Sequence, residues 1–224
     1  MKNGLGLEDE ALLNQEGFDL WAEGYDKSVG LSDDDHAYPF AGYREILNEI
    51  YNQVLRRSAK KILDIGFGTG VLTSRLYEQG CEMSGQDFSD KMIQIAQKKM
   101  PKANLYAGDF TNGLVEPLKK QRYDAIIATY SLHHLNDEEK ILMIKSLLAL
   151  LNEGGVIYIG DVAFQTREEM ESCKADAGES WDDEEIYFIY EELKERLPNL
   201  KFKKYSFCSG LFTISNEPVR MNER

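Results

Sequence analysis

The chain has 224 residues, and 42% of them are hydrophobic, which is enough for a packed core and argues against wholesale disorder. Its 26 basic and 39 acidic residues give a formal net charge of −13. So acidic a surface repels polyanions, which argues against duplex nucleic acids and anionic membranes as partners.

The first expected elements are helices within residues 9–57. Trp21 and Tyr25 stand one helical turn apart, and a second helix is expected from Phe40 to Leu55. Alternation of strands and helices begins only at Lys61. We therefore divide the chain into an N-terminal helical part (1–57), an α/β domain (58–216) and a C-terminal tail (217–224).

The segment Ile62–Gly70 is the most informative part of the chain. Its apolar run, interrupted by Asp64, predicts a buried parallel strand that ends in the alternate glycines Gly66, Gly68 and Gly70. Glycines leave bare backbone for a ligand, and the following helix points its free N–H groups toward the end of the strand. The acid ahead of the first glycine suits a cation better than a phosphate. This turn therefore predicts a nucleotide-type site.

After this turn, strands and helices alternate, which predicts a doubly wound and mostly parallel sheet with helices on both faces. Further strands are expected at Cys81–Gln86, Ala103–Ala107, Tyr123–Thr129 and Val156–Gly160. Ser89 and Asn136 or Asp137 are expected to cap the helices that follow the second and fourth strands.

The pattern weakens beyond Asp161. An acid-rich segment, residues 176–185, is expected to be a solvated loop without a metal site. A helix should follow, with the inner stripe Ile186, Ile189, Tyr190, Leu193 and Leu197. The strands 201–207 and 211–215 should then form a terminal hairpin that turns at Ser209-Gly210.

Acidic residues also mark the ends of the second and third strands, as Asp87 and Asp109. Each acid taken alone is explained by capping or solvation. Together with Asp64 they stand at successive carboxyl ends of parallel strands, where α/β proteins bind nucleotides. Phe88 and Phe110 flank the two acids and are expected to sandwich a base.

A dinucleotide-binding fold is the main competitor for this motif. Its fingerprint, Gly-x-Gly-x-x-Gly, needs a glycine where this chain has Val71, because the third glycine comes one place early at Gly70. Some sixty residues precede the first strand, and the remaining length leaves no room for a separate substrate domain. These features disfavour a dehydrogenase.

The pattern Asp-Ile-Gly-Phe-Gly-Thr-Gly resembles motif I of the class I S-adenosylmethionine-dependent methyltransferases. The resemblance covers roughly residues 18–216 and is strongest to small bacterial methyltransferases of the ubiquinone-biosynthesis-like type. Those proteins have a Trp-Ala-x-x-Tyr-Asp element, here Trp21–Asp26, and a His-His-Leu element, here His133–Leu135. Gln86 departs from the family, in which a branched apolar residue is commoner.

The resemblance implies a Rossmann-like α/β fold with a seven-stranded sheet, mostly parallel with an antiparallel last strand, and an N-terminal helical lid. It implies S-adenosylmethionine as the cofactor, with Asp87 on the ribose and Asp109 on the adenine amino group. The residues expected to bind the cofactor are Asp64, Gly66, Gly68, Gly70, Asp87, Phe88, Asp109, Phe110, Thr129 and Tyr130.

His133 and His134 follow the fourth strand directly and are the candidates for a catalytic base, because imidazole titrates near neutral pH. The alternative is that one or both brace the loop, and we interpret one as structural and the other as part of the acceptor pocket. Tyr25 on the lid is a further catalytic candidate, whereas Trp21 is expected to anchor its helix. No metal is expected, since the two histidines have no third ligand nearby in the sequence.

These observations predict an enzyme that methylates a small-molecule acceptor. The alternative is a non-catalytic S-adenosylmethionine-binding or regulatory protein. A cytoplasmic location is expected, because the three cysteines show no paired or metal-like spacing and no apolar signal core or membrane span is found. The sequence leaves the acceptor and the oligomeric state open.

Overall fold

A computed structural model of the chain describes residues 37–216. Within them, a single sheet has the strand order β3-β2-β1-β4-β5-β8-β7, and the additional strand β6 pairs with β5. The strands are β1 (Lys61–Ile65), β2 (Glu82–Asp87), β3 (Asn104–Ala107), β4 (Tyr123–Thr129), β5 (Leu151–Phe164), β6 (Phe188–Ile189), β7 (Lys201–Lys204) and β8 (Ser209–Ser215). The α-helices are α2 (Tyr43–Arg56), α3 (Val71–Glu78), α4 (Asp90–Lys99), α5 (Glu116–Lys119), α6 (Asp137–Leu148), α7 (Arg167–Ala177) and α8 (Tyr190–Leu193). The 3₁₀-helices are η2 (Phe110–Asn112), η3 (Leu132–His134) and η4 (Gly178–Ser180).

The sheet confirms the predicted fold class. β1 pairs in parallel with both β2 and β4, and β8 pairs antiparallel with β5 and β7. The short β6, parallel to β5, is an addition to the expected seven strands. The strand order reverses between β1 and β4, and ligands of open α/β sheets bind at such a point, beyond the carboxyl ends of the strands.

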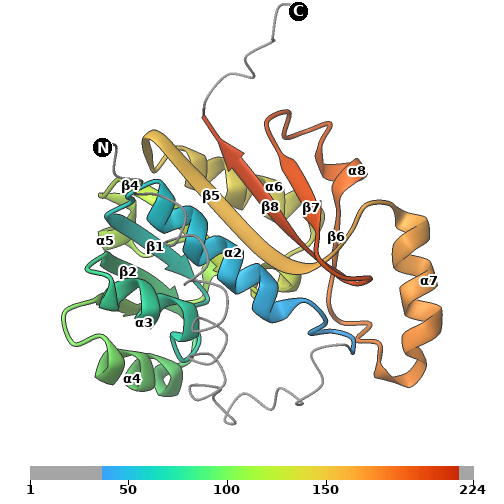
Figure 1. The fold of residues 1–224 in the computed structure, drawn as a ribbon, viewed down its shortest axis with the longest axis horizontal. Helices are drawn as coiled ribbons and strands as arrows, with labels where there is room; N and C mark the ends of the chain where they lie inside the picture. Colours follow the sequence, from blue (N-terminus) through green and yellow to red (C-terminus); the bar gives the residue numbers. More distant parts are fainter. Residues whose placement is uncertain (1–36, 217–224) are drawn as a thin grey trace, which may run out of the picture. The chain divides into compact units, whose positions relative to one another are not determined.

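Helices cover both faces of the sheet, with α2 in front of the strands and α6 behind them (Figure 1). Successive residues of β5 face opposite layers. Ile157 and Ile159 share a core cluster with Ile144 of α6, whereas a side chain at Gly160 would overlap Ile46 of α2. Gly160 therefore allows α2 to lie directly on the sheet.

The N-terminal predictions are only partly covered by the described residues. Trp21, Tyr25 and most of the expected lid lie outside them. Part of the segment that we assigned to the lid, residues 43–56, forms α2, whose residues Ile46, Leu47, Ile50 and Val54 are buried.

Two predictions after β5 are wrong. The stripe from Ile186 to Leu197 is not one helix, because β5 extends to Phe164 and its end pairs with Phe188–Ile189. Consecutive residues of this extended segment are therefore buried, as expected for a strand that is covered on both faces. Ser209 and Gly210 are the first residues of β8 and not a turn; a side chain at Gly210 would collide with the ring of Phe202.

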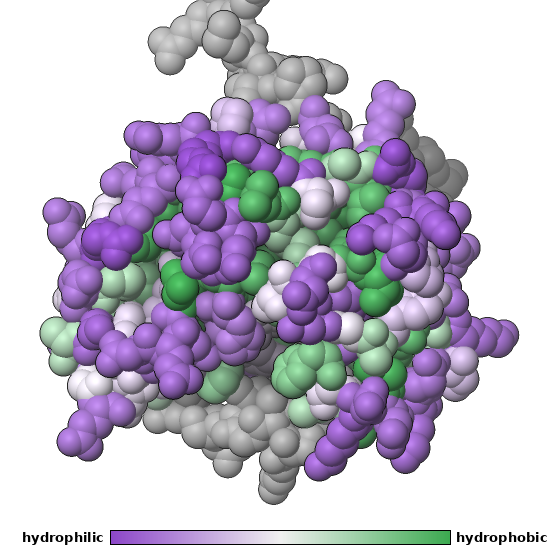
Figure 2. Space-filling model, turned by 180° about the vertical axis from the view of Figure 1, so that it is seen from behind, coloured by the Kyte–Doolittle hydropathy of each residue, from purple (hydrophilic) through white to green (hydrophobic). Residues whose placement is uncertain are grey.

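Within residues 37–216, no helix is long and apolar enough to cross a membrane. Figure 2 shows one face of the molecule, on which hydrophilic side chains surround separate apolar areas. The large hydrophobic side chains with the greatest exposure are scattered, as Phe88, Leu142, Ile186 and Phe207. Single exposed hydrophobic residues of this kind are ordinary on protein surfaces.

Candidate functional site

The glycine turn after β1 is left-handed at each of its alternate glycines, with φ of 69° at Gly66, 55° at Gly68 and 75° at Gly70. A side chain at Gly66 would place its Cβ only 2.5 Å from Cβ of Ser131. A Cβ at Gly68 would meet no atom of residues 37–216 within 4 Å. The first glycine is thus needed for close packing, and the second presents bare backbone to open space.

Asp64, the second-last residue of the strand ahead of this turn, is almost completely buried. Thr73 of α3 donates a hydrogen bond to Oδ2, whereas Oδ1 has no partner among the described residues. Burial raises the pKa of Asp64 to about 7, and the charge of Asp87 adds to the shift, against the opposing bond from Thr73. A buried acceptor without a partner destabilises a fold, so Oδ1 is suited to a ligand that donates to it.

Asp87 and Asp109 stand at the ends of β2 and β3 as predicted. Asp87 is buried and accepts hydrogen bonds from the backbone N–H groups of Gly68, at 2.8 Å, and Ser89, at 2.9 Å. It therefore joins the glycine turn to the end of β2. Asp109 is exposed and caps η2: the hydroxyl of Thr111, at 2.7 Å, and its N–H hold the pKa of Asp109 below its usual range.

The two flanking aromatic residues differ in exposure. Phe88 is 72% exposed and its ring is open to a ligand, whereas Phe110 is 5% exposed and belongs to the main core. Gln86, the departure from the family pattern, is fully buried. Its side-chain amide donates a hydrogen bond to the carbonyl of Gly113 and accepts one from the N–H of Val115. This polar side chain therefore fixes the loop that follows η2.

The histidine loop, residues 130–135, begins where β4 ends at Thr129. Tyr130 is left-handed, with φ of 49°, and its ring contacts Phe40 and Tyr43 at centroid distances of 5.7 and 5.0 Å. Burial raises the pKa of Tyr130 far above its usual value, so its hydroxyl stays protonated. The Ser131 hydroxyl donates to the carbonyl of Ile65 at 2.9 Å, which attaches this loop to the glycine turn.

His133 is buried between two carboxylates. Its Nδ1 lies 2.7 Å from Oδ1 of Asp161 at the sheet, and its Nε2 lies 3.3 Å from Oε1 of Glu185. Burial by itself lowers the pKa of His133, but the charge and hydrogen bond of Asp161, with the charge of Glu185, raise it overall. Asp161 also accepts from the N–H of Val162 at 2.8 Å.

His134 is exposed, and its ring centroid lies 4.4 Å from that of His133. Partial burial and the neighbouring His133 lower its pKa, so the imidazole is neutral at neutral pH with a lone pair available. This geometry fits our interpretation that one histidine is structural and the other faces an acceptor. The two histidines have no third ligand nearby in the sequence, but the fold brings Glu185 beside them as a potential one. Sequence reasoning missed Glu185, whose only signal was its place in an acid-rich segment.

Aromatic side chains connect the first described residues, near Tyr38, with the loop 181–187. Tyr38 stacks on Trp181 at 5.2 Å, and its hydroxyl bonds the Tyr187 hydroxyl and accepts from the N–H of Asp182 at 3.2 Å. The histidine loop contacts the same segment, because the N–H of Ile186 donates to the carbonyl of His133 at 2.8 Å. Residues 38–43, 130–135 and 181–187 thus form one side of the candidate site.

A protein-family model described as a methyltransferase domain matches residues 62–155. An uncharacterized methyltransferase of Anoxybacillus flavithermus is 33% identical over 202 residues, which is 90% of this chain and 91% of the relative. Another, from Oceanobacillus iheyensis, is 38% identical over 151 residues, 67% of this chain and 68% of the relative.

Solved structures show the same fold. Magnesium protoporphyrin IX methyltransferase from Synechocystis PCC 6803, crystallised with bound SAH, has a TM-score of 0.62 at 18% identity and covers 91% of this chain and 96% of its own. An S-adenosylmethionine-dependent methyltransferase from Clostridium acetobutylicum has a TM-score of 0.63 at 16% identity, with 89% and 98% covered.

Proposed function

This chain belongs to the class I S-adenosylmethionine-dependent methyltransferases, and from that premise we propose that it methylates a small-molecule acceptor bound beside the histidine loop. The observation that supports the cofactor part of this proposal most directly comes from the carboxyl edge of β1 and β2. A buried carboxylate oxygen of Asp64 without a described partner and the bare backbone of Gly68 lie there within one turn.

These residues fit the cofactor. The carboxylate of Asp64 suits the cofactor's ammonium group, because a nearby cation favours the ionised form of a buried acid. Asp87 uses one hydrogen bond on each oxygen for the backbone and keeps lone pairs for ribose hydroxyls. We assign the adenine to Asp109 and to the ring of Phe88, which is 72% exposed. When bound, S-adenosylmethionine supplies an electrophilic methyl group, whose bond to sulfur breaks with its electron pair returning to sulfur.

The remaining work of the protein is to orient the acceptor and to handle its proton. Orientation of two reactants can supply roughly 7–11 kcal/mol of the barrier. We assign the acceptor side to His134, whose neutral and exposed imidazole has a lone pair for an acceptor proton. His133 is assigned a positioning role, because Asp161 and Glu185 hold both of its ring nitrogens.

Ligand-dependent melting of the full chain tests the cofactor part. S-adenosylmethionine and S-adenosylhomocysteine should raise the melting temperature, as any ligand of the native state does, and NAD should not. Stabilisation by NAD alone would overturn the proposal.

The transfer is tested with S-adenosylmethionine labelled in its methyl group and a pool of bacterial metabolites. We expect label in one or a few small molecules, each heavier by one methyl group than its precursor. Cofactor binding without any labelled product from the pool would instead support the regulatory alternative.

A further inference from the structure

His133, His134 and Glu185 form a cluster of potential metal ligands. Each offers one ligand atom, and these atoms all lie within 4.8 Å of one another. The histidines belong to η3, after β4, whereas Glu185 comes from the loop between η4 and β6. The fold therefore brings the nitrogens of two adjacent histidines together with an oxygen from more than fifty residues further along the chain.

The spacing within the cluster suits a small divalent cation. In a tetrahedral zinc site, metal–ligand bonds of about 2.0–2.2 Å place neighbouring ligand atoms about 3.3 Å apart. Nε2 of His133 and Oε1 of Glu185 are 3.3 Å apart. The spacing of these two atoms therefore matches that of neighbouring ligands on one ion.

The surroundings of His133 resemble an outer coordination shell. Histidines that bind metals commonly donate their other ring N–H to a carboxylate, which fixes the tautomer and the ring orientation. Asp161 stands in this relation to His133, with its Oδ1 2.7 Å from Nδ1, and it is completely buried. The other ring nitrogen, Nε2, faces Oε1 of Glu185.

The loop that contains Glu185 is fixed against the histidines. The N–H of Ile186 donates to the carbonyl of His133, and the buried ammonium group of Lys140 donates to the carbonyl of Ile186. On the other side, His134 is exposed, which leaves an approach from solvent. A site that is rigid on one side and open on the other can hold an ion and keep a position for a further ligand.

We propose that His133, His134 and Glu185 bind one divalent metal ion such as Zn²⁺. One coordination position of the ion stays open on the acceptor side. Two imidazole nitrogens with one carboxylate are ligands that such ions accept. The acceptor class rests on the proposed function and changes the role of His134, whose lone pair would bind the ion instead of taking the acceptor proton. The acceptor would then be a hydroxyl or thiol at the open position, which gives its proton to solvent and attacks the methyl group with the freed electron pair. Coordination of this kind makes a nucleophile available at neutral pH.

Metal binding is tested directly on the full chain after chelator treatment. Titration calorimetry with ZnCl₂ should show one equivalent bound, and Co²⁺ should give the visible absorption of a nitrogen- and oxygen-ligated site. Glu185→Gln and His134→Ala should each weaken Zn²⁺ binding by roughly 100-fold or more, and Asp161→Asn by about 10- to 100-fold.

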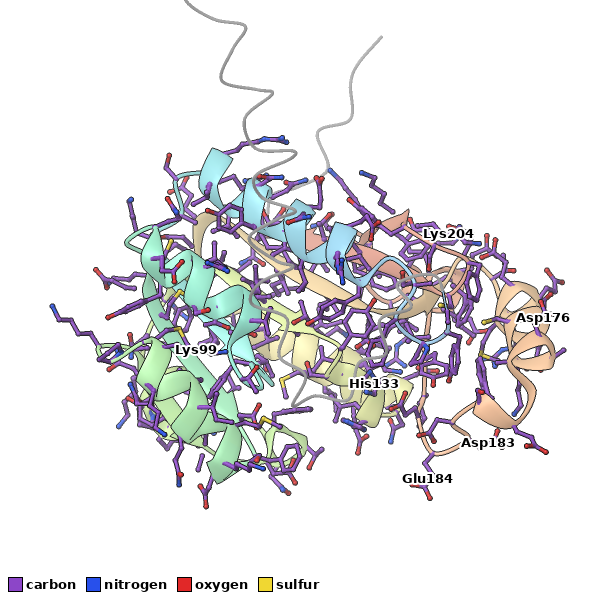
Figure 3. The ribbon with its side chains drawn as sticks, turned by 60° about the horizontal axis from the view of Figure 1, so that its bottom comes forward. Lys99, His133, Asp176, Asp183, Glu184 and Lys204 are labelled. Carbon is purple, nitrogen blue, oxygen red and sulfur yellow. The ribbon has the colours of Figure 1, made fainter. Side chains whose placement is uncertain are left out.

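Glu184→Gln is the matched control, because Glu184 is exposed and, as Figure 3 shows, stands at the outer edge of the loop, away from His133. It should bind Zn²⁺ as the unmodified chain does. Failure to bind Zn²⁺, or equal binding by Glu185→Gln, would overturn the metal site. Melting shifts with S-adenosylmethionine, measured on the same metal-free samples, report separately on the proposed function.

Discussion

The proposed cofactor side and the proposed acceptor side of the site are built in different ways. On the cofactor side, bare backbone and carboxylates cooperate over short stretches of chain, and the bond from Gly68 to Asp87 spans 19 residues. On the acceptor side, aromatic rings and imidazoles meet from distant segments, and the hydroxyl pair Tyr38 and Tyr187 spans 149 residues.

The two sides therefore depend on different parts of the sequence. The cofactor side depends on the turn geometry of one strand end and needs few side chains, so it suits a ligand common to all members. The acceptor side depends on which side chains three loops bring together. We therefore expect changes on one side to leave the other side's function intact, and the following predictions test that separation.

The largest effect is expected on the acceptor side, from His134→Asn. Without a basic lone pair at this position, the initial rate of label transfer to the identified acceptor should fall by about 10²–10⁴. The affinity for S-adenosylmethionine, measured by calorimetry, should stay the same because we assign His134 to the acceptor and not to the cofactor. An unchanged transfer rate would return His134 to a purely structural role.

Asp87→Ala should have the next largest effect, and on cofactor binding alone. Two lost hydrogen bonds to a charged group, at about 1.5–3 kcal/mol each, weaken S-adenosylmethionine binding by roughly 100-fold or more. Calorimetry should show this loss, with Asp90→Ala as the control, since Asp90 is an exposed acid at the start of α4. Equal affinity in both variants would show that the ribose acid is misassigned.

A pH effect is expected from Asp64, whose pKa is about 7 in the folded protein. Because the cofactor's cation favours the ionised acid, the affinity for S-adenosylmethionine should fall up to about tenfold for each pH unit below 7. Calorimetry on Asp64→Asn should show weaker binding without this slope. The same slope in the variant would assign the titration to another group.

Asp64 also links stability to pH in the cofactor-free protein. Its folded pKa lies above the unfolded value near 3.8, so stabilisation is complete below pH 4 and is lost as pH rises to about 7. The free energy of unfolding should fall over this window by at most about 4 kcal/mol. Urea unfolding of the unmodified chain and Asp64→Asn, compared at several pH values, isolates this contribution.

The smallest effect is expected from Tyr38→Phe. The variant loses the bonds of one hydroxyl to Tyr187 and to the N–H of Asp182, which should lower the free energy of unfolding by about 1 kcal/mol. Urea unfolding measures this loss, and cofactor affinity should not change. A double variant with Tyr187→Phe should lose less than the sum of the two single changes, because neither hydroxyl is then left unpaired. Simple additivity would show that the two hydroxyls are independent.

The same contrast explains how much of the site could be predicted from the sequence. The glycine turn and the three acids are recognisable because their roles follow from short spacings and strand ends. The sheet is predictable for the same reason, and β4 has the bounds that its apolar run indicated. Gln86 shows the limit even here, since its bonds to Gly113 and Val115 depend on how a later loop folds back.

On the acceptor side, prediction ended at the pair of histidines. Nothing in their adjacency indicates which ring is buried, because that depends on Asp161 in β5 and on the loop before β6. Because we expected one helix over residues 186–197, the predicted position of that loop was also wrong. The error arose because an apolar stripe at helical spacing is also compatible with a short buried strand followed by a single helical turn.

The contact between Gly66 and Ser131 has a consequence for the evolution and engineering of this enzyme. The space that a Cβ at residue 66 would need is already filled by Ser131, and the Ser131 hydroxyl holds the carbonyl of Ile65. A loop transplanted from another enzyme to alter substrate choice must therefore keep a small hydroxyl residue at position 131, or be moved together with the glycine turn. The two segments are exchangeable only as one module.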